Sequence, residues 1–240
     1  MEKFKVEVWS DIVCPFCYIG KKNYELALEK FEHSSEIELE FKSFQLDPQF
    51  SHNPDDRYDL NKGLAEKYNK SLAEIEQMQV HIKQSAHAVG LNFDFENSYR
   101  FNTENAHRLL HKAHDKGIGT KMSEAFFSAY LEKGLNLAKP EILKQVAVEN
   151  GLSPEEVDDA LTNETFAYRV QQDMQEAGNL RISGVPFFVF NRKYGVSGAQ
   201  PVDVFLKTLE QSYEDWKKTT PSKLEIIDDG ARCDINGNCE

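Results

Sequence analysis

Apolar and polar residues alternate in two segments near the start of the chain. Residues 4–9 read FKVEVW and residues 36–44 read EIELEFKSF. An apolar residue at every second position is typical of a half-buried strand, so both segments are predicted to be β-strands. Between them, apolar residues recur at helical spacing from Leu26 to Phe31, which predicts a helix after Cys17.

The middle of the chain is predicted to be almost wholly helical, because helix start and stop signals follow one another closely. Ser71 with Glu74, and Ser153 with Glu156, match the capping-box pattern that opens a helix. Pro140 suits a first helical turn. The helices expected from these signals run from Ser71 towards Gly90, from Asn102 or Thr103 to near Gly117, from residue 120 to 133, from Pro140 to Gly151, from Ser153 onwards, and over 164–177.

Strand character returns only near the end of the chain. Residues 185–190 and 194–196 are predicted strands, joined by a hairpin turn over 191–193 and followed by a helix over 202–216. The order is β-α-β, a helical block, then β-β-α. It predicts an α/β fold in which a helical insertion interrupts a four-stranded sheet. The expected parts are a discontinuous sheet domain over 1–55 and 179–218, an all-helical insert over 56–178, and an acidic tail over 219–240.

Charge and hydropathy narrow the classes of partner. The chain has 28 Lys and Arg against 40 Asp and Glu, a formal net charge of −12. Nucleic acids and anionic membranes bind basic patches, so neither is expected as a partner. No stretch approaches the roughly 20 apolar residues that span a bilayer. Charged residues interrupt the apolar positions of the first segment, so we expect no secretory signal and a cytoplasmic location.

The chemistry of the chain is concentrated in Cys14-Pro15-Phe16-Cys17, at the junction of the first strand and its helix. A helix N-terminus stabilises a thiolate, and Pro15 fits the first helical turn. Cys14 is therefore the predicted nucleophile, and Cys17, one turn further on, the thiol that resolves a mixed disulfide. In a cytosolic chain with few cysteines, such a pair is more often catalytic or metal-binding than a structural disulfide.

One alternative is that the pair forms half of a zinc site together with Cys233 and Cys239. The second pair has five intervening residues, whereas structural zinc favours two short-spaced pairs. We therefore favour redox chemistry over zinc.

A second motif, Gly184-Val185-Pro186, precedes the apolar segment Phe187-Phe188-Val189. By itself it is typical of an edge-strand proline. A strand, Cys-Pro-x-Cys-Tyr, a helical insert and then Gly-Val-Pro, in this order, resemble the thioredoxin-fold DsbA family. The stretches 10–20 and 102–109 resemble in particular its FrnE-like branch.

The resemblance implies a thioredoxin-like fold with a central mixed sheet and a cis Val185–Pro186 peptide against the cysteines. It also implies that the residue before the proline offers its backbone to a substrate strand, and that the proline keeps metal away from the thiols. The substrate-binding residues expected on this basis are Val185, Pro186, Pro15 and Phe16. Periplasmic oxidases of the family carry a His where this chain has Phe16. Phe16 neither donates a hydrogen bond nor carries charge, so we expect a less extreme reduction potential, closer to a reductase or isomerase.

Polar residues around these motifs have two interpretations each. Asp11, three residues before Cys14, could relay a proton to or from the resolving thiol, or it could be a turn or cap residue. His107, His111 and His114 fall at i, i+4 and i+7 on one helix face. Such a face can bind metal, but without matching carboxylates or cysteines we favour a solvated face.

The last cysteines, Cys233 and Cys239, flank the tight-turn signal Asn236-Gly237. The turn allows them to approach within disulfide range. Some FrnE-like proteins carry a similar terminal pair, and the resemblance implies a second redox pair that exchanges electrons with Cys14 and Cys17 or shields them. The alternative is two exposed thiols without a role.

Together these features predict a thiol–disulfide oxidoreductase that acts on protein disulfides. It is expected to need no organic cofactor or metal. Its predicted partners are disulfide-containing or thiol polypeptides, with glutathione or thioredoxin as electron donor. An alternative of another class is a kappa-type glutathione transferase or 2-hydroxychromene-2-carboxylate isomerase-like enzyme. That group shares the architecture, but the resemblance implies that its members have Ser at the position of Cys14. A third is a non-enzymatic zinc-binding or chaperone-like module.

Overall fold

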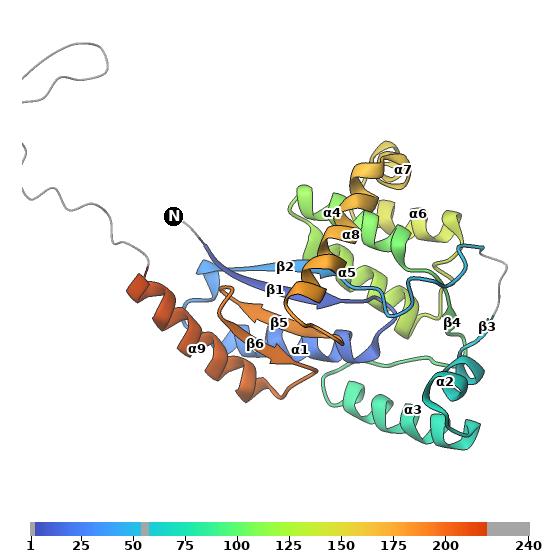
Figure 1. Cartoon of the computed structure of the whole chain (residues 1–240), viewed down its shortest axis with the longest axis horizontal. Helices are drawn as coiled ribbons and strands as arrows, with labels where there is room; N and C mark the ends of the chain where they lie inside the picture. Colours follow the sequence, from blue (N-terminus) through green and yellow to red (C-terminus); the bar gives the residue numbers. More distant parts are fainter. Residues whose placement is uncertain (1–2, 54–57, 220–240) are drawn as a thin grey trace, which may run out of the picture.

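Strands and helices follow one another along residues 3–53 and 58–219, which the computed structural model describes (Figure 1). The elements are β1 (Phe4–Ser10), α1 (Pro15–Lys30), the 3-10 turn η1 (Ser34–Glu36), β2 (Ile37–Ser43), β3 (Tyr58–Asp59), α2 (Leu60–Tyr68), α3 (Leu72–His87), β4 (Tyr99–Arg100), α4 (Glu104–Asp115), α5 (Gly119–Phe127), the π turn η2 (Ser128–Glu132), α6 (Pro140–Glu149), α7 (Pro154–Thr162), α8 (Glu164–Asn179), β5 (Phe187–Phe190), β6 (Tyr194–Ser197) and α9 (Val202–Thr219). In these described ranges no helix has both the length and the apolar character to span a membrane.

The central sheet has four strands in the order β2-β1-β5-β6. β1 is parallel to β2 and antiparallel to β5, with Trp9 opposite Phe187 at the end of the β1–β5 pairing. β5 and β6 form an antiparallel hairpin whose turn residues Asn191 and Arg192 have φ values of 46° and 56°. Two consecutive left-handed residues are typical of a type I′ hairpin turn. The predicted mixed sheet and its hairpin are thus confirmed.

Helices cover both faces of the sheet, which explains why β1 and β5 are so rich in apolar residues (Figure 1). On one face α1 and α9 pack around Phe188, whose ring lies 5.5 Å from that of Tyr24 and 4.7 Å from that of Phe205. On the other face Trp9 is fully buried, and its indole N–H donates to the backbone carbonyl of Asp173 on α8 at 3.0 Å. The β1–β5 pair is therefore held from both sides.

Between β2 and β5 the chain runs through the helical insertion. Both predicted capping boxes are present: the Glu74 N–H donates to Ser71 Oγ at 3.3 Å, and the Glu156 N–H donates to Ser153 Oγ at 3.2 Å. α4 starts at Glu104, whose N–H donates to the side chain of Asn102 at 3.0 Å. α4, α5 and α8 all contact β2. The division into a sheet domain and an insert at residues 55/56 and 178/179 stays a prediction.

The structure also contains elements that the periodicity did not indicate. α2 is capped by Asp59, whose side chain accepts hydrogen bonds from the N–H groups of Asn61 and Lys62. β3 and β4 pair over only two residues each. Two residues are too few to show alternation. β5 starts at Phe187 rather than residue 185, because Pro186 has no N–H for the ladder. The Cys233 and Cys239 pair lies outside the described residues.

Candidate active site

Cys14 occupies the position just before the first turn of α1. A turn follows β1, with the Cys14 N–H donating to the Asp11 carbonyl at 3.0 Å, and the Cys17 N–H donates to the Cys14 carbonyl at 3.0 Å. Pro15 is the first helical residue, and the Cys14 side chain caps no backbone N–H group. The Cys14 sulfur is thus located at a helix N-terminus, where unpaired N–H groups and the helix dipole favour negative charge.

The two thiols differ in their surroundings. Both are free cysteines in the described structure, with 5% of Cys14 and 2% of Cys17 exposed. Burial, reinforced by the neighbouring Cys14 sulfur, raises the pKa of the Cys17 thiol well above its usual value, against hydrogen bonds from Ser10 and the Asp11 backbone. Cys17 therefore keeps its proton at neutral pH.

The loop before β5 lies directly against Cys14. The Val185–Pro186 peptide is cis, as the resemblance implied, and the Cys14 thiol donates to the Val185 carbonyl at 3.7 Å. On its other side Pro186 contacts α1 at Gly20, where a Cβ would come within 3.0 Å of the proline Cγ. The absence of a side chain at Gly20 lets the loop approach this close.

Asp11 links the cysteine turn to two other segments. It is 1% exposed, and its Oδ2 accepts the Leu46 N–H at 2.8 Å. Its Oδ1 lies 3.4 Å from Nε2 of His107, and neither of these two atoms has a hydrogen-bond partner among the described residues. The carboxylate therefore holds the loop after β2 in place, while one of its oxygens is left without a donor.

The expectation of a solvated histidine face on α4 is wrong for two of its three residues. His107 is 1% and His111 7% exposed, and only His114 is half-buried. The reason is tertiary, because α4 packs against β2, α5, α7 and α8. Among the described residues no three His, Cys, Asp or Glu side chains cluster as a metal site.

His111 of α4 pairs with Asp173 of α8. Its Nε2 lies 3.2 Å from Asp173 Oδ2 and 3.1 Å from Ser43 Oγ. Burial lowers the pKa of His111, although Asp173 acts the other way. Burial would raise the pKa of Asp173, but hydrogen bonds from His111 and the Ser43 N–H hold it below its usual value. A neutral imidazole and an ionised carboxylate therefore coexist here at pH 7.

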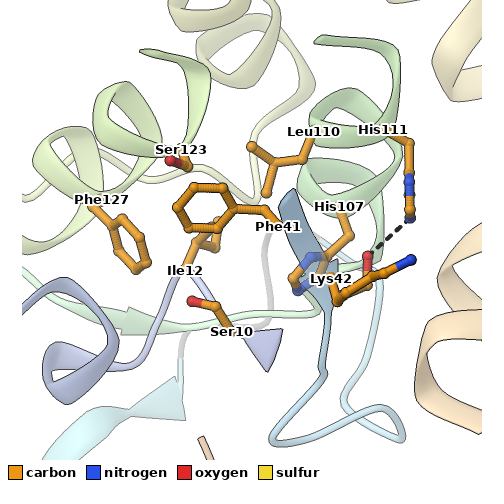
Figure 2. Close-up of a pocket in the computed structure, with 10 residues that line it drawn as sticks. Ser10, Ile12, Phe41, Lys42, His107, Leu110, His111, Ser123 and Phe127 are labelled. Atoms are coloured by element: carbon orange, nitrogen blue, oxygen red, sulfur yellow. Dashed lines mark hydrogen bonds between the residues drawn. The ribbon is translucent and has the colours of Figure 1, made fainter. Parts of the chain in front are cut away.

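His107 and His111 line a small cavity of about 10 Å³, to which Ser10 also contributes. Figure 2 shows these three side chains around it. That volume holds about one water molecule. The Ser10 hydroxyl also hydrogen-bonds Cys17 and lowers the pKa of its thiol, so Ser10 connects this cavity to Cys17.

A larger cavity of about 190 Å³ opens beside Cys14, between the cysteine turn and helices α2 and α3. Its lining includes Pro15 and Phe16 from the motif, and Leu64, Ile75 and Ile82 from the insertion. The sequence allows for a groove formed by the helical insert but gives neither its size nor its lining. Ile75 and Ile82 lie on α3, and only the packing of that helix shows what they face.

The fold and this site define a thioredoxin-fold protein with a two-cysteine centre opposite a cis-proline loop. The model of the DSBA-like thioredoxin domain matches residues 5–210, so the chain belongs to that family. A probable DsbA oxidoreductase from Streptomyces coelicolor, SCO1869, is 36% identical and covers 99% of this chain and 98% of its own, with a TM-score of 0.84. The uncharacterized protein YwbO of Bacillus subtilis is 27% identical, over 85% of this chain and 94% of its own length.

Two solved structures of lower identity share the fold. The cytosolic disulfide reductase DsbM from Pseudomonas aeruginosa with GSH is 17% identical, with a TM-score of 0.62 over 88% of this chain and 99% of its own. A 2-hydroxychromene-2-carboxylate isomerase is 11% identical, with a TM-score of 0.68 over 90% of this chain and 100% of its own.

The buried His111 predicts how stability depends on pH. Its pKa in the folded state lies below the ordinary 6.5, so the unfolded chain binds the proton more readily and stability falls as pH drops below about 6.5. We expect thermal denaturation at pH 7.0, 6.0 and 5.5 to show this loss in the wild type and a flatter profile in His111→Gln. His114→Gln, on the half-buried turn of the same helix, should keep the wild-type slope. Equal slopes for wild type and His111→Gln would contradict the assignment.

Proposed function

We propose that this protein is a thiol–disulfide oxidoreductase that acts on protein disulfides through Cys14 and Cys17. The observation that carries the proposal is the asymmetry of the two thiols. Both thiols are buried, but Cys14 lies at a helix N-terminus, 3.7 Å from the Val185 carbonyl, whereas the pKa of the Cys17 thiol is raised. These surroundings support attack by the Cys14 thiol and resolution of the mixed disulfide by the Cys17 thiol.

The reaction takes two exchanges. The Cys14 thiolate attacks one sulfur of a substrate disulfide, which forms a mixed disulfide and releases the other sulfur as a thiolate. Cys17 then loses its proton and attacks the Cys14 sulfur, which releases the second substrate thiol and leaves a Cys14–Cys17 disulfide. A thiol donor such as glutathione or thioredoxin returns the pair to its reduced form. The proposed substrate contacts are Val185, Pro186, Pro15 and Phe16.

We assign Cys17→Ser as the trapping variant, because it retains Cys14 but removes the resolving thiol. It should accumulate a mixed disulfide with a disulfide-containing peptide, seen as a mass increase that a reductant removes. Cys14→Ser should trap nothing.

The same variant separates the oxidoreductase from the isomerase alternative. The intact Cys14–Cys17 pair favours redox exchange, while the shared fold of the chromene-carboxylate isomerase keeps the alternative open. Glutathione-dependent turnover of 2-hydroxychromene-2-carboxylate by Cys17→Ser, without any trapped peptide, would overturn our proposal.

The direction we propose is that of a reductase or isomerase working in the cytoplasm. Phe16 is 44% exposed beside the helix N-terminus, and its side chain offers no donor to a Cys14 thiolate. The reduced pair therefore lacks one source of stabilisation that makes a strong oxidant. The fold likeness to the cytosolic reductase DsbM supports the same direction, and its structure with GSH supports glutathione as a donor.

Replacing Phe16 tests this direction. We expect Phe16→His to raise the reduction potential by about 30 mV or more, because an imidazole can donate to the thiolate and stabilise the reduced pair. Phe16→Leu, which also removes the ring but adds no donor, should stay close to wild type. Potentials are read from equilibration with glutathione buffers. A wild-type reduction potential of about −120 mV, the value of DsbA, would contradict the proposed reductase direction.

Asp11 is our proposed proton acceptor for Cys17. It is buried, its backbone contacts the Cys17 thiol, and its Oδ1, 3.4 Å from Nε2 of His107, has no hydrogen-bond partner in the described part of the chain. A buried carboxylate oxygen without a donor can take up a proton at little cost in lost hydrogen bonds. The competing role, a turn residue that only holds Leu46, rests on the other oxygen.

Asp11→Asn separates the two roles, because it retains an oxygen for the Leu46 N–H but removes the acid. In single-turnover reactions we expect unchanged attack by Cys14 and resolution by Cys17 slowed by about tenfold or more. The residual rate should rise with pH, because the raised pKa of Cys17 leaves its thiolate scarce at neutral pH. Asp159→Asn, whose carboxylate contacts Lys112, is the matched control. If Asp11→Asn resolved the mixed disulfide at the wild-type rate, Asp11 would be a turn residue without a role in proton transfer.

The proposal for a second redox pair concerns Cys233 and Cys239. Both lie outside the described residues, and the pair stays a prediction from the sequence.

A further inference from the structure

The pocket beside Cys14 is built for an apolar group. Its volume of about 190 Å³ exceeds the about 150 Å³ of an engineered protein cavity that stays dry and binds benzene. Its walls include Ile75, Phe95, Phe101 and Leu131, all of them buried side chains without polar atoms. A group of about the size of a phenyl ring therefore fits the space and matches its surface.

The charged residues Arg100, Asp47 and Lys67 at the pocket are already engaged with protein atoms. Asp11, which also lines the pocket, is held through its Oδ2 by the Leu46 N–H. Arg100 forms an ion pair with Asp47, and the Lys67 ammonium donates to the Leu46 carbonyl at 3.4 Å. A charged ligand would have to displace these contacts or give up its hydration without a partner. The pocket thus disfavours ionic groups in its depth.

An extended peptide backbone does not suit the pocket either. Main-chain N–H and C=O groups buried among apolar side chains would lose their hydrogen bonds to water without replacement. Only a side chain, or the apolar arm of a small molecule, satisfies the walls. A substrate main chain would instead pass the loop of Val185, outside the pocket.

The position of Cys14 in the pocket wall connects this space to the reaction. When Cys14 attacks a disulfide, the organic group on the attacked sulfur comes to lie beside the pocket wall. A substituent that reaches from this sulfur into the cavity is buried in the intermediate, and its burial favours the attack. Phe16 and Met78, which are 44% and 36% exposed, lie at the pocket where such a group would enter.

We propose that the pocket between the cysteine turn and helices α2 and α3 selects disulfides whose attacked sulfur carries a bulky apolar group. The inference rests on the proposed function, because it assumes attack by Cys14. The reaction is Cys14 thiolate plus R–S–S–X, giving Cys14–S–S–R and the X thiolate. Cys17 then displaces R–S⁻, which takes up the proton that Cys17 releases, and the Cys14–Cys17 disulfide forms. The group R is the part that the pocket recognises.

The test uses two mixed disulfides of 5-thio-2-nitrobenzoate, one with 2-phenylethanethiol and one with 2-mercaptoethanol. Both release the same coloured thiolate, so attack on the alkyl sulfur is followed directly. Each rate constant for the reduced enzyme is divided by the rate constant of dithiothreitol with the same compound. This ratio corrects for the intrinsic reactivity of each mixed disulfide. We expect the phenylethyl compound to react at least about tenfold faster on this scale, from the apolar area that it buries.

Variants on α3 locate the preference. Met78→Trp fills the pocket and should bring the phenylethyl rate down to that of the hydroxyethyl compound. Val80→Trp places the same side chain on an exposed position of α3 that does not line the pocket, and should retain the preference. Leu64→Ala, which enlarges the pocket, should retain reaction with the phenylethyl compound while extending it to a naphthylethyl analogue.

Two cysteine peptides identify the source of the apolar group. The nitrobenzoate mixed disulfides of acetyl-Cys-Phe-amide and acetyl-Cys-Ser-amide are compared in the same way. A preference for the Phe peptide assigns the pocket to a side chain beside a substrate cysteine, and a preference confined to the phenylethyl compound assigns it to small molecules. Equal normalised rates for every pair would overturn the inference while leaving the oxidoreductase intact. No reaction above that of Cys14→Ser would overturn the proposed function itself.

Discussion

The antiparallel pairing of β1 with β5 is the interaction on which the site depends. It places Trp9 opposite Phe187, so that the turn after β1 and the loop before β5 meet at the same end of the sheet. Cys14 and Val185, which are far apart in the chain, come within hydrogen-bonding distance as a result. The pairing is stabilised from both faces, by α1 and α9 around Phe188 and by α8 against Trp9. Because both strands are central, they cannot slip without exposing one of these clusters.

The helical insertion contributes more than cover for the sheet. Its α4 places His107 against Asp11, directly after the end of β1, and His111 against Asp173. Its α2 and α3 close a pocket whose opposite wall is the cysteine turn. Polar and apolar surroundings therefore lie on different sides of the two cysteines. The buried polar side adjoins Cys17, from which a proton leaves in the proposed reaction. The apolar side adjoins Cys14, where the proposed substrate binds.

Local signals predicted much of the fold. The capping boxes at Ser71 and Ser153 depend on residues three positions apart, and the alternation in β1 and β2 depends on neighbours, so a sequence shows both. The histidines of α4 show the limit of such signals. A polar face is normally solvated, but here it meets β2 and α8, so that His111 is buried against Asp173 and His107 is buried close to Asp11. The helix α2 was not predicted, because it is short and starts after a segment without periodicity.

The sequence by itself determined the cysteine pair, its place at a strand–helix junction, and the order of the elements. These follow from covalent neighbours and from periodicity, which are properties of short segments. Only the tertiary structure decided which thiol is more deeply buried, what Asp11 touches, and that an apolar cavity opens beside Cys14. Burial and the pairing of distant groups depend on how helices far apart in the chain pack together, and a pKa or a cavity arises only from that packing.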